Sequence, residues 1–144
     1  MVKYLISLVV FLFGTVSAMV LSGGAIFLDI PSFIIIGILP FLFVSILFGF
    51  KEMCLAFSTA FRNNTDKGQL LNAISFFKMY GKTIWITCFI TILISVISIL
   101  GFLEDKSVIG PNLAIVLISV LYTALINVLI IIPFTIFLKK QLKE

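Results

Sequence analysis

The stretch TIWITCFITILISVISILGFL, residues 83–103, carries no charge and is long enough to cross a lipid bilayer. About 20 residues of α-helix, at about 1.5 Å per residue, span the roughly 30 Å of hydrocarbon in a membrane. Three further uncharged runs are at least as long, at residues 4–28, 30–50 and 107–138. The sequence therefore predicts an all-α integral membrane protein with four transmembrane helices. The predicted spans cover about residues 3–22, 31–50, 83–103 and 110–138.

The composition of the whole chain agrees with this class. Of its 144 residues, 62% are hydrophobic and 11% are charged, and the mean hydropathy is +1.32. Soluble domains carry about 25% charged residues, so this chain has too few charges to cover a globular surface. We expect a single four-span membrane domain over residues 1–144, in which residues 51–82 form a compact cytoplasmic loop of two short helices. Thr65 or Asp66 is expected to cap the second of them.

The basic residues predict the orientation of the chain. If both termini lie in the cytoplasm, nine of the ten basic residues are inside and Lys106 alone is outside. Such an excess of lysine and arginine is typical of the cytoplasmic side of a membrane protein. The net charge of +4 therefore reflects topology and favours contact with anionic lipid, and it does not indicate binding to nucleic acid.

The first run also has features of a cleavable signal peptide. Lys3 provides a basic start, and Val16-Ser17-Ala18 has the small residues of a cleavage site. The apolar stretch continues past Ala18, however, which favours a retained first span.

The sequence shows no pattern typical of a metal site or an enzyme. Cys54 and Cys88 have neither disulfide nor zinc-site spacing, and the chain has no histidine. The six acidic residues lie in predicted loops or tails, where they form no hydrolase or transferase constellation. We expect a protein that is not an enzyme and holds no metal or cofactor. Because no predicted span carries an acid, a base or a histidine near the middle of the membrane, the chain alone is a poor candidate for a proton pump.

Polar side chains recur at helical spacing in the third and last predicted spans. In the third span, each hydroxyl lies within about 40° of the one before it, so all share a face. The candidate lining residues are Thr83, Thr87, Thr91, Ser95, Ser119, Thr123 and Asn127. Small hydroxylated residues are enriched at helix contacts in membranes, where a hydrogen bond contributes about 0.6–2 kcal/mol. Two interpretations therefore stay open, which are helix packing and the lining of a polar space.

Turn and cap signals flank the second and last spans. Asp29 precedes Pro31 by two positions, where a carboxylate can bond the free amides at the start of the second span. Pro31 suits the first turn of that helix, and Gly110-Pro111 is expected to begin the last one. Three residues are expected to allow a bend within a span, and these are Gly37, Pro40 and Pro133.

Two segments, LSGGAIFLDIPSFIII (residues 21–36) and IGPNLAIVLISVLYTALINVLIIIP (residues 109–133), resemble the A subunit of flagellar stator units. That subunit belongs to the superfamily of ion-driven motors that includes TolQ and ExbB. Thr123 stands where the family usually has glycine, and the loop at 51–82 replaces a large cytoplasmic domain. The residues that match the family pattern are Gly23, Gly24, Asp29, Pro31, Ser32, Ile109, Gly110, Pro111, Ser119, Leu121, Tyr122 and Pro133.

The resemblance implies a function for the polar faces. In this family five A-type subunits surround two single-span B-type subunits, whose helix carries an aspartate that takes and releases protons or sodium ions. The resemblance thus implies a homopentameric ring in the bacterial inner membrane, with both termini inside. The polar faces of the third and last spans would line the path of the transported H+ or Na+ and contact the partner helices.

Two other classes of function remain open. A small four-span transporter usually needs a glutamate within the membrane, and none of the predicted spans contains one. A non-catalytic membrane scaffold protein would need no such group.

Overall fold

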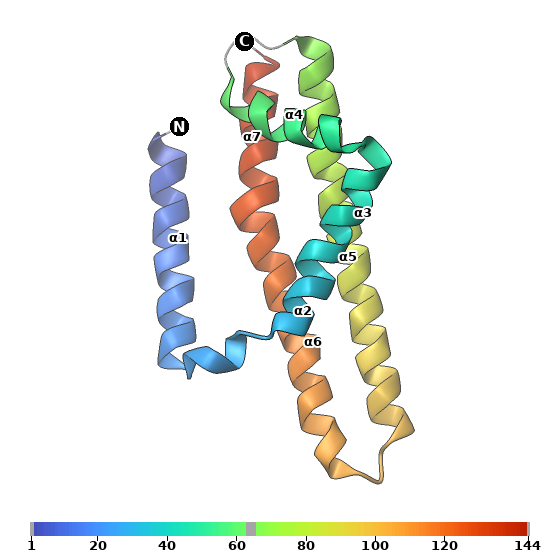
Figure 1. The fold of residues 1–144 in the computed structure, drawn as a ribbon. Coiled ribbons are helices and arrows are strands. Elements are labelled where there is room, and N and C mark those ends of the chain that lie inside the picture. The colour runs from blue at the N-terminus through green and yellow to red at the C-terminus, as the bar shows by residue number, and fades with distance from the viewer. Residues whose placement is uncertain (1, 63–65, 144) are drawn as a thin grey trace. The chain divides into compact units, whose positions relative to one another are not determined.

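The computed structural model shows an all-helical chain (Figure 1). It describes residues 2–62 and 66–143, apart from the side chains of residues 2–5, 25 and 26. Contacts divide the chain into two compact units, Met1–Ile30 and Pro31–Glu144. The predicted all-α membrane fold is confirmed in its class, whereas the single domain over residues 1–144 stays a prediction.

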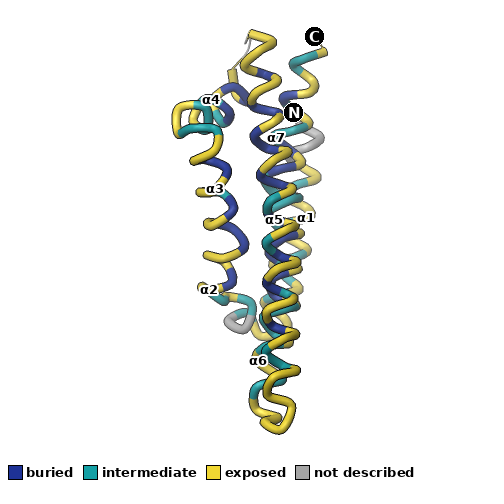
Figure 2. The backbone as a smooth tube through the Cα atoms, turned by 90° about the vertical axis from the view of Figure 1, so that its right-hand side faces the viewer, coloured by how far each residue is buried: buried dark blue, intermediate teal, exposed yellow. Residues whose placement is uncertain are grey.

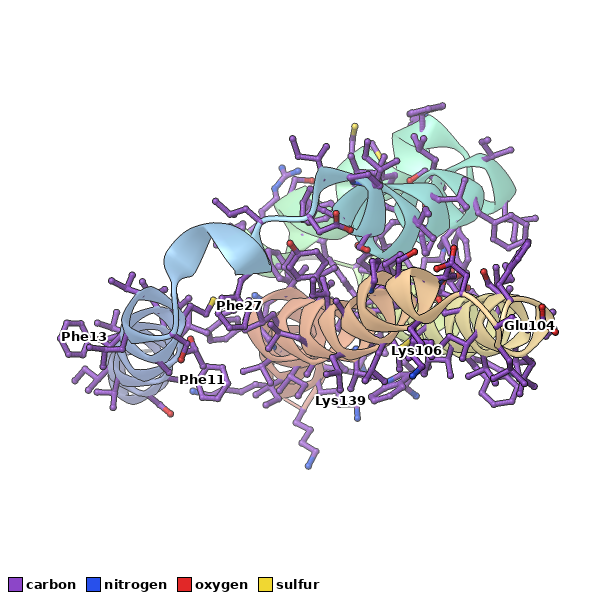
Figure 3. All side chains as sticks on the ribbon, turned by 90° about the horizontal axis from the view of Figure 1, so that it is seen from below. Phe11, Phe13, Phe27, Glu104, Lys106 and Lys139 are labelled. Carbon is purple, nitrogen blue, oxygen red and sulfur yellow. The ribbon has the colours of Figure 1, made fainter. Side chains whose placement is uncertain are left out.

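The first unit is an apolar helix followed by a tight turn. Helix α1 (Val2–Leu21) leads into the 3-10 helix η1 (Gly24–Phe27). Between them Gly23 has a φ of +98°, a conformation that glycine adopts without the steric cost of a Cβ. Aromatic side chains of α1, among them Phe11 and Phe13, project from the helix (Figure 3).

The second unit begins with a span that is built from three helical segments. These are α2 (Ile30–Phe33), the π-helical turn η2 (Ile34–Ile38) and α3 (Leu39–Phe48). Gly49, at a φ of +87°, ends α3 and precedes α4 (Phe50–Phe61). The rest of the unit is a long hairpin of α5 (Lys67–Gly101), α6 (Lys106–Ile126), the π-helical turn η3 (Asn127–Ile131) and α7 (Ile132–Gln141).

Within the described part of the chain, three helical segments are long and apolar enough to cross a membrane. They are Ile30–Phe48, Lys67–Gly101 and Lys106–Gln141. Residues Ile6–Leu21 form a shorter apolar helix within α1. By the length and hydropathy of these helices the chain is a multi-span membrane protein. That α1 is a fourth span, and that both termini lie in the cytoplasm, stay predictions.

The predicted loop over residues 51–82 is only partly a loop. Its first short helix is confirmed as α4, but its second is the beginning of α5, which continues without a break to Gly101. No proline separates the two parts, so the helix continues through Gly81 into the uncharged segment. Asp66 caps α5 by accepting a hydrogen bond from the Gly68 amide at 3.1 Å. Thr65, the other predicted cap, lies outside the described residues.

The last helix begins earlier than Gly110-Pro111, so that prediction is wrong. Asp105 accepts hydrogen bonds from the side chain and the amide of Ser107, the latter at 3.0 Å, and α6 begins at Lys106. The two bonds from Ser107, the side-chain bond first, lower the pKa of the Asp105 carboxyl. This cap lies in the short turn that also holds Glu104 (Figure 3). Pro111 is consequently inside the helix.

The predicted bends coincide with the two π-helical turns. Gly37 lies in η2, which ends two residues before Pro40, and η3 ends two residues before Pro133. In each case the backbone N–H that follows the turn donates to the carbonyl five residues earlier. A proline cannot donate to the helix ladder, and wider turns of this kind are usual at such positions.

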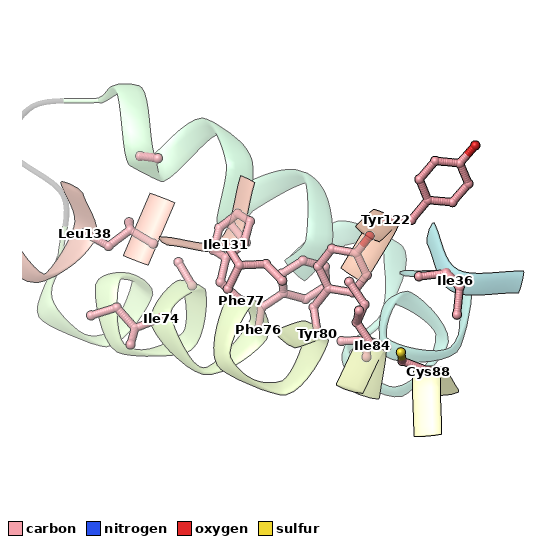
Figure 4. Close-up of a cluster of buried hydrophobic side chains, with 14 of the residues drawn as sticks. Ile36, Ile74, Phe76, Phe77, Tyr80, Ile84, Cys88, Tyr122, Ile131 and Leu138 are labelled. Atoms are coloured by element: carbon pink, nitrogen blue, oxygen red, sulfur yellow. The ribbon is translucent and has the colours of Figure 1, made fainter. Parts of the chain in front are cut away.

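The core of the second unit is an aromatic cluster where α3, α4, α5 and α7 meet (Figure 4). Phe77 of α5 is fully buried. Its ring stacks on Phe134 of α7 with the centroids 4.8 Å apart and meets the edge of Phe57 of α4 at 5.1 Å. Residues that were expected to form a separate loop therefore supply much of the core.

The span formed by α2, η2 and α3 packs beside the part of α5 that begins near Phe76. Phe48 contacts Phe76, and Phe41 contacts Tyr80, with ring centroids 5.6 and 5.5 Å apart. Near the start of the span, Phe33 meets Tyr122 of α6 at 5.9 Å. The hairpin end of α5 and α6 extends past the start of α2 (Figure 1). The helices are thus staggered along their axes.

A buried hydrogen bond joins this span to α5 at the level of η2. The Tyr80 hydroxyl donates to the Gly37 carbonyl at 3.1 Å. We expect Tyr80→Phe to lower the free energy of unfolding by about 1 kcal/mol, the usual net value of such a bond in proteins and membranes. Chemical unfolding of the detergent-solubilised protein measures this change. Ser58→Ala is the control, because the Ser58 hydroxyl is exposed and bonds only the Leu55 carbonyl of its own helix. Equal stability of Tyr80→Phe and Ser58→Ala would contradict the prediction.

Candidate functional site

The predicted hydroxyls of α5 lie toward its buried face. Thr91 and Ser95 are 7% and 4% exposed, whereas Thr83 and Thr87 are half-buried. The Thr83 hydroxyl donates to the Met79 carbonyl, and the Thr91 hydroxyl to the Thr87 carbonyl, each at 2.9 Å. Bonds of this kind satisfy a hydroxyl within its own helix, as is common for threonine in membranes.

The predicted polar residues of α6 are bonded differently. Ser119 and Thr123 are both 0% exposed, yet neither side-chain oxygen has a hydrogen-bond partner among the described residues. The half-buried Asn127 donates from Nδ2 to the Thr123 carbonyl at 2.8 Å. Burying a hydroxyl without a partner costs about 1–3 kcal/mol in proteins. Ser119 and Thr123 are therefore polar groups that the chain itself does not satisfy.

The second unit brings four of the predicted hydroxyls into its interior. Thr91 and Ser95 lie on α5, and Ser119 and Thr123 lie on α6, the helix with which α5 packs most extensively. The span of α2 to α3 packs against α5 and α6, and its buried residues lie on the side of its coil that faces the hairpin (Figure 2). The sequence placed these hydroxyls on one face of each helix. The tertiary structure shows that this face is covered by helices of the same chain.

The exposed surface of the hairpin is apolar along most of the uncharged segments. From Trp85 to Leu100 on α5 and from Leu113 to Val120 on α6, the large exposed side chains are hydrophobic. The uncharged segments 83–103 and 107–138 contain no acid, base or histidine. A charged group at the level of Ser119 and Thr123 would therefore have to come from an ion or from another molecule.

Some of the predicted cap and hinge residues lie at a helix start or next to a turn, whereas Gly110 and Pro111 lie inside α6. Asp29 directly precedes α2, and Pro31 occupies the first turn of that helix. A Cβ added to Gly110 would meet nothing within 4 Å, and the adjacent Pro111 lies inside α6. Pro133 is buried just after η3. The capping role of Asp29 stays a prediction.

Sequence reasoning missed the close contact of Gly81 with η3. A Cβ at Gly81 would lie 3.2 Å from Cγ2 of Ile131 and 3.6 Å from Oδ1 of Asn127. The sequence shows a glycine between Tyr80 and Lys82, which hints at a close contact. It does not show that residues of η3, far along the chain, make that contact. Among the described residues there is no group of three or more histidine, cysteine, aspartate or glutamate side chains placed to hold a metal ion.

Comparison with known proteins identifies no relative of this chain: no family model matches it, and it has no significant match among curated proteins or solved structures.

Proposed function

We propose that this chain is the ring-forming subunit of a proton- or sodium-driven two-component motor in the bacterial inner membrane. The observation that supports it best is the pair of buried, unpartnered hydroxyls of Ser119 and Thr123 in a helix without charge. A membrane protein that binds or moves an ion usually has an ionisable group near the path. Here that group belongs to a partner, a single-span B-type subunit with an aspartate within the membrane.

The hydroxyls suit this role because they are polar without bearing charge. A serine or threonine hydroxyl donates one hydrogen bond and accepts others, so it can bond water, a carboxylate or a hydrated ion. Since both side chains lie beneath helices of their own chain, the partner backbone does not touch them directly. They act through a water or an ion that moves between the partner carboxylate and the interior of the hairpin.

The ring itself follows from the resemblance to flagellar stator A subunits on residues 21–36 and 109–133. Five copies would surround two partner helices, with both termini in the cytoplasm. We expect the load of such a motor to differ from that of flagellar stators, because flagellar A subunits carry a large cytoplasmic domain and this chain has only residues 51–82 in that place. The described part of that segment belongs to α4 and the start of α5.

Co-purification tests this proposal. The chain is expressed together with any single-span protein that a neighbouring gene encodes with an aspartate in its membrane segment, and the subunits of the complex are counted by native mass spectrometry. We expect five copies of this chain with two of the partner. A dimer of this chain without a partner would contradict the motor and indicate a small transporter instead. A monomer that binds no single-span protein would contradict both.

A further inference from the structure

One exposed face of α5 changes from lysine to aromatic residues along the helix. Lys78, Lys82, Trp85 and Phe89 follow one another at spacings of four, three and four residues, so they fall within about 60° of one another around the axis. All four are exposed, Trp85 by 53% and Phe89 by 61%. This face lies about 130° around the helix from the buried face that carries Thr91, so it is separate from the site described above.

The order of these residues matches the layers of a membrane surface. Lys82 is the last charged residue before the uncharged segment 83–103. Trp85 follows about 4.5 Å further along the helix, and Phe89 about 10 Å further, at about 1.5 Å per residue. Tryptophan is enriched at the membrane–water interface, and lysine extends its ammonium group toward the headgroups while its methylene stem stays in apolar surroundings.

The charge on this face is of one sign. Helix α5 contains no acidic residue, and Lys78 and Lys82 lie one turn apart on the same side. Two ammonium groups at that spacing can hold one phosphate, since lysine binds phosphate as a point charge. We propose that Lys78, Lys82 and Trp85 bind the headgroup of an anionic phospholipid, with an acyl chain along Phe89. A second copy of this chain that packed its own α5 on the same face would supply no counter-charge to the two ammonium groups, because α5 has no acidic residue.

Fluorescence of Trp85 tests this site, because it is the only tryptophan in the chain. The full chain is reconstituted in mixed vesicles of phosphatidylcholine and phosphatidylglycerol, in which one lipid or the other carries brominated acyl chains that quench tryptophan. We expect brominated phosphatidylglycerol to quench Trp85 with an apparent affinity on the order of tenfold higher than brominated phosphatidylcholine. Two lysines close to a lipid surface are sufficient for a preference of that size.

The variants separate a site from general surface charge. In K78Q/K82Q the preference for phosphatidylglycerol should disappear, so that the two brominated lipids quench Trp85 with about equal affinity. In K78R/K82R the preference should remain. Lys67→Gln is the matched control, because Lys67 lies on the same face but about 22 Å from Lys82 along α5. It should keep the wild-type preference.

Three results would overturn the proposal. Equal quenching by the two lipids in the wild type would show that there is no anionic site. Absence of quenching by either lipid would show that protein covers Trp85. A loss of preference in Lys67→Gln as large as in K78Q/K82Q would show that only the total charge of the chain matters. None of these results bears on the ring or on its single-span partner.

Discussion

Phe77→Ala is expected to destabilise the protein by about 3–5 kcal/mol, the range for removing a large aromatic side chain from a packed core. Phe77 is 0% exposed and lies where three helices meet. It contacts Phe57 of α4, Phe134 of α7 and Phe76 of its own helix, with ring centroids 5.1, 4.8 and 5.4 Å apart. Aromatic pairs at such distances contribute about 0.5–1.5 kcal/mol beyond the area that they bury.

The measurement is chemical unfolding in detergent or bicelles, followed by circular dichroism. Phe89→Ala is the matched control, because Phe89 lies on the same helix but is 61% exposed. Its truncation should change the free energy of unfolding by less than about 1 kcal/mol. If the two variants were equally stable, the aromatic cluster would not be the core that holds α4 and α7 on α5.

The double variant S119A/T123V is expected to abolish most ion flux while leaving the protein as stable as the wild type or more stable. Both hydroxyls are buried and have no partner among the described residues, so removing them relieves a cost of about 1–3 kcal/mol each. Alanine and valine closely preserve the volumes of serine and threonine, so the packing of α6 should not change.

Flux should fall because the same hydroxyls are proposed to help replace solvent around an ion or a carboxylate. A hydrogen bond to a charged group contributes about 1.5–3 kcal/mol, and each 1.4 kcal/mol added to a barrier slows transport about tenfold. Flux is measured in vesicles that contain the chain with its single-span partner, and unfolding is measured on the same preparation. Ser75→Ala is the control, since the Ser75 hydroxyl is exposed and bonds the Leu71 carbonyl at 2.9 Å.

The two measurements in this experiment discriminate between the interpretations of the polar stripe. Lower stability with normal flux would show that the hydroxyls are packing contacts whose partners lie in an assembled complex. Normal stability with normal flux would remove Ser119 and Thr123 from the ion path altogether. Only normal or raised stability together with lost flux agrees with the proposed function.

Several features of this protein were determined by the sequence alone, because they depend on local properties of the chain. The length of an uncharged segment and its hydropathy are sums over neighbouring residues. The membrane class was therefore predictable, and so were long apolar helices that include residues 31–48 and 83–101. The shared face of Thr87, Thr91 and Ser95 follows from the helical repeat. The interruptions of α-helical hydrogen bonding just before Pro40 and Pro133 agree with the missing N–H of proline.

Helix boundaries were less predictable where two local signals competed. Gly110-Pro111 is a good helix start, but the Asp105 carboxylate bonds the Ser107 amide and starts α6 four residues earlier. The change from charged to uncharged residues at Thr83 marks a change of surroundings and not an end of helical hydrogen bonding. Helix α5 therefore continues through it.

Only the tertiary structure decided what the polar faces and the predicted loop do. The periodicity of a helix shows which residues share a face, but it does not show which neighbour covers that face. Ser119 and Thr123 are buried because α6 packs against α5 and the α2–α3 span, and Phe77 is central because α4 and α7 meet over it. Such contacts join residues far apart in the chain, and their energies depend on shape complementarity between whole helices. That complementarity is a property of the folded molecule, which a pattern of single residues does not contain.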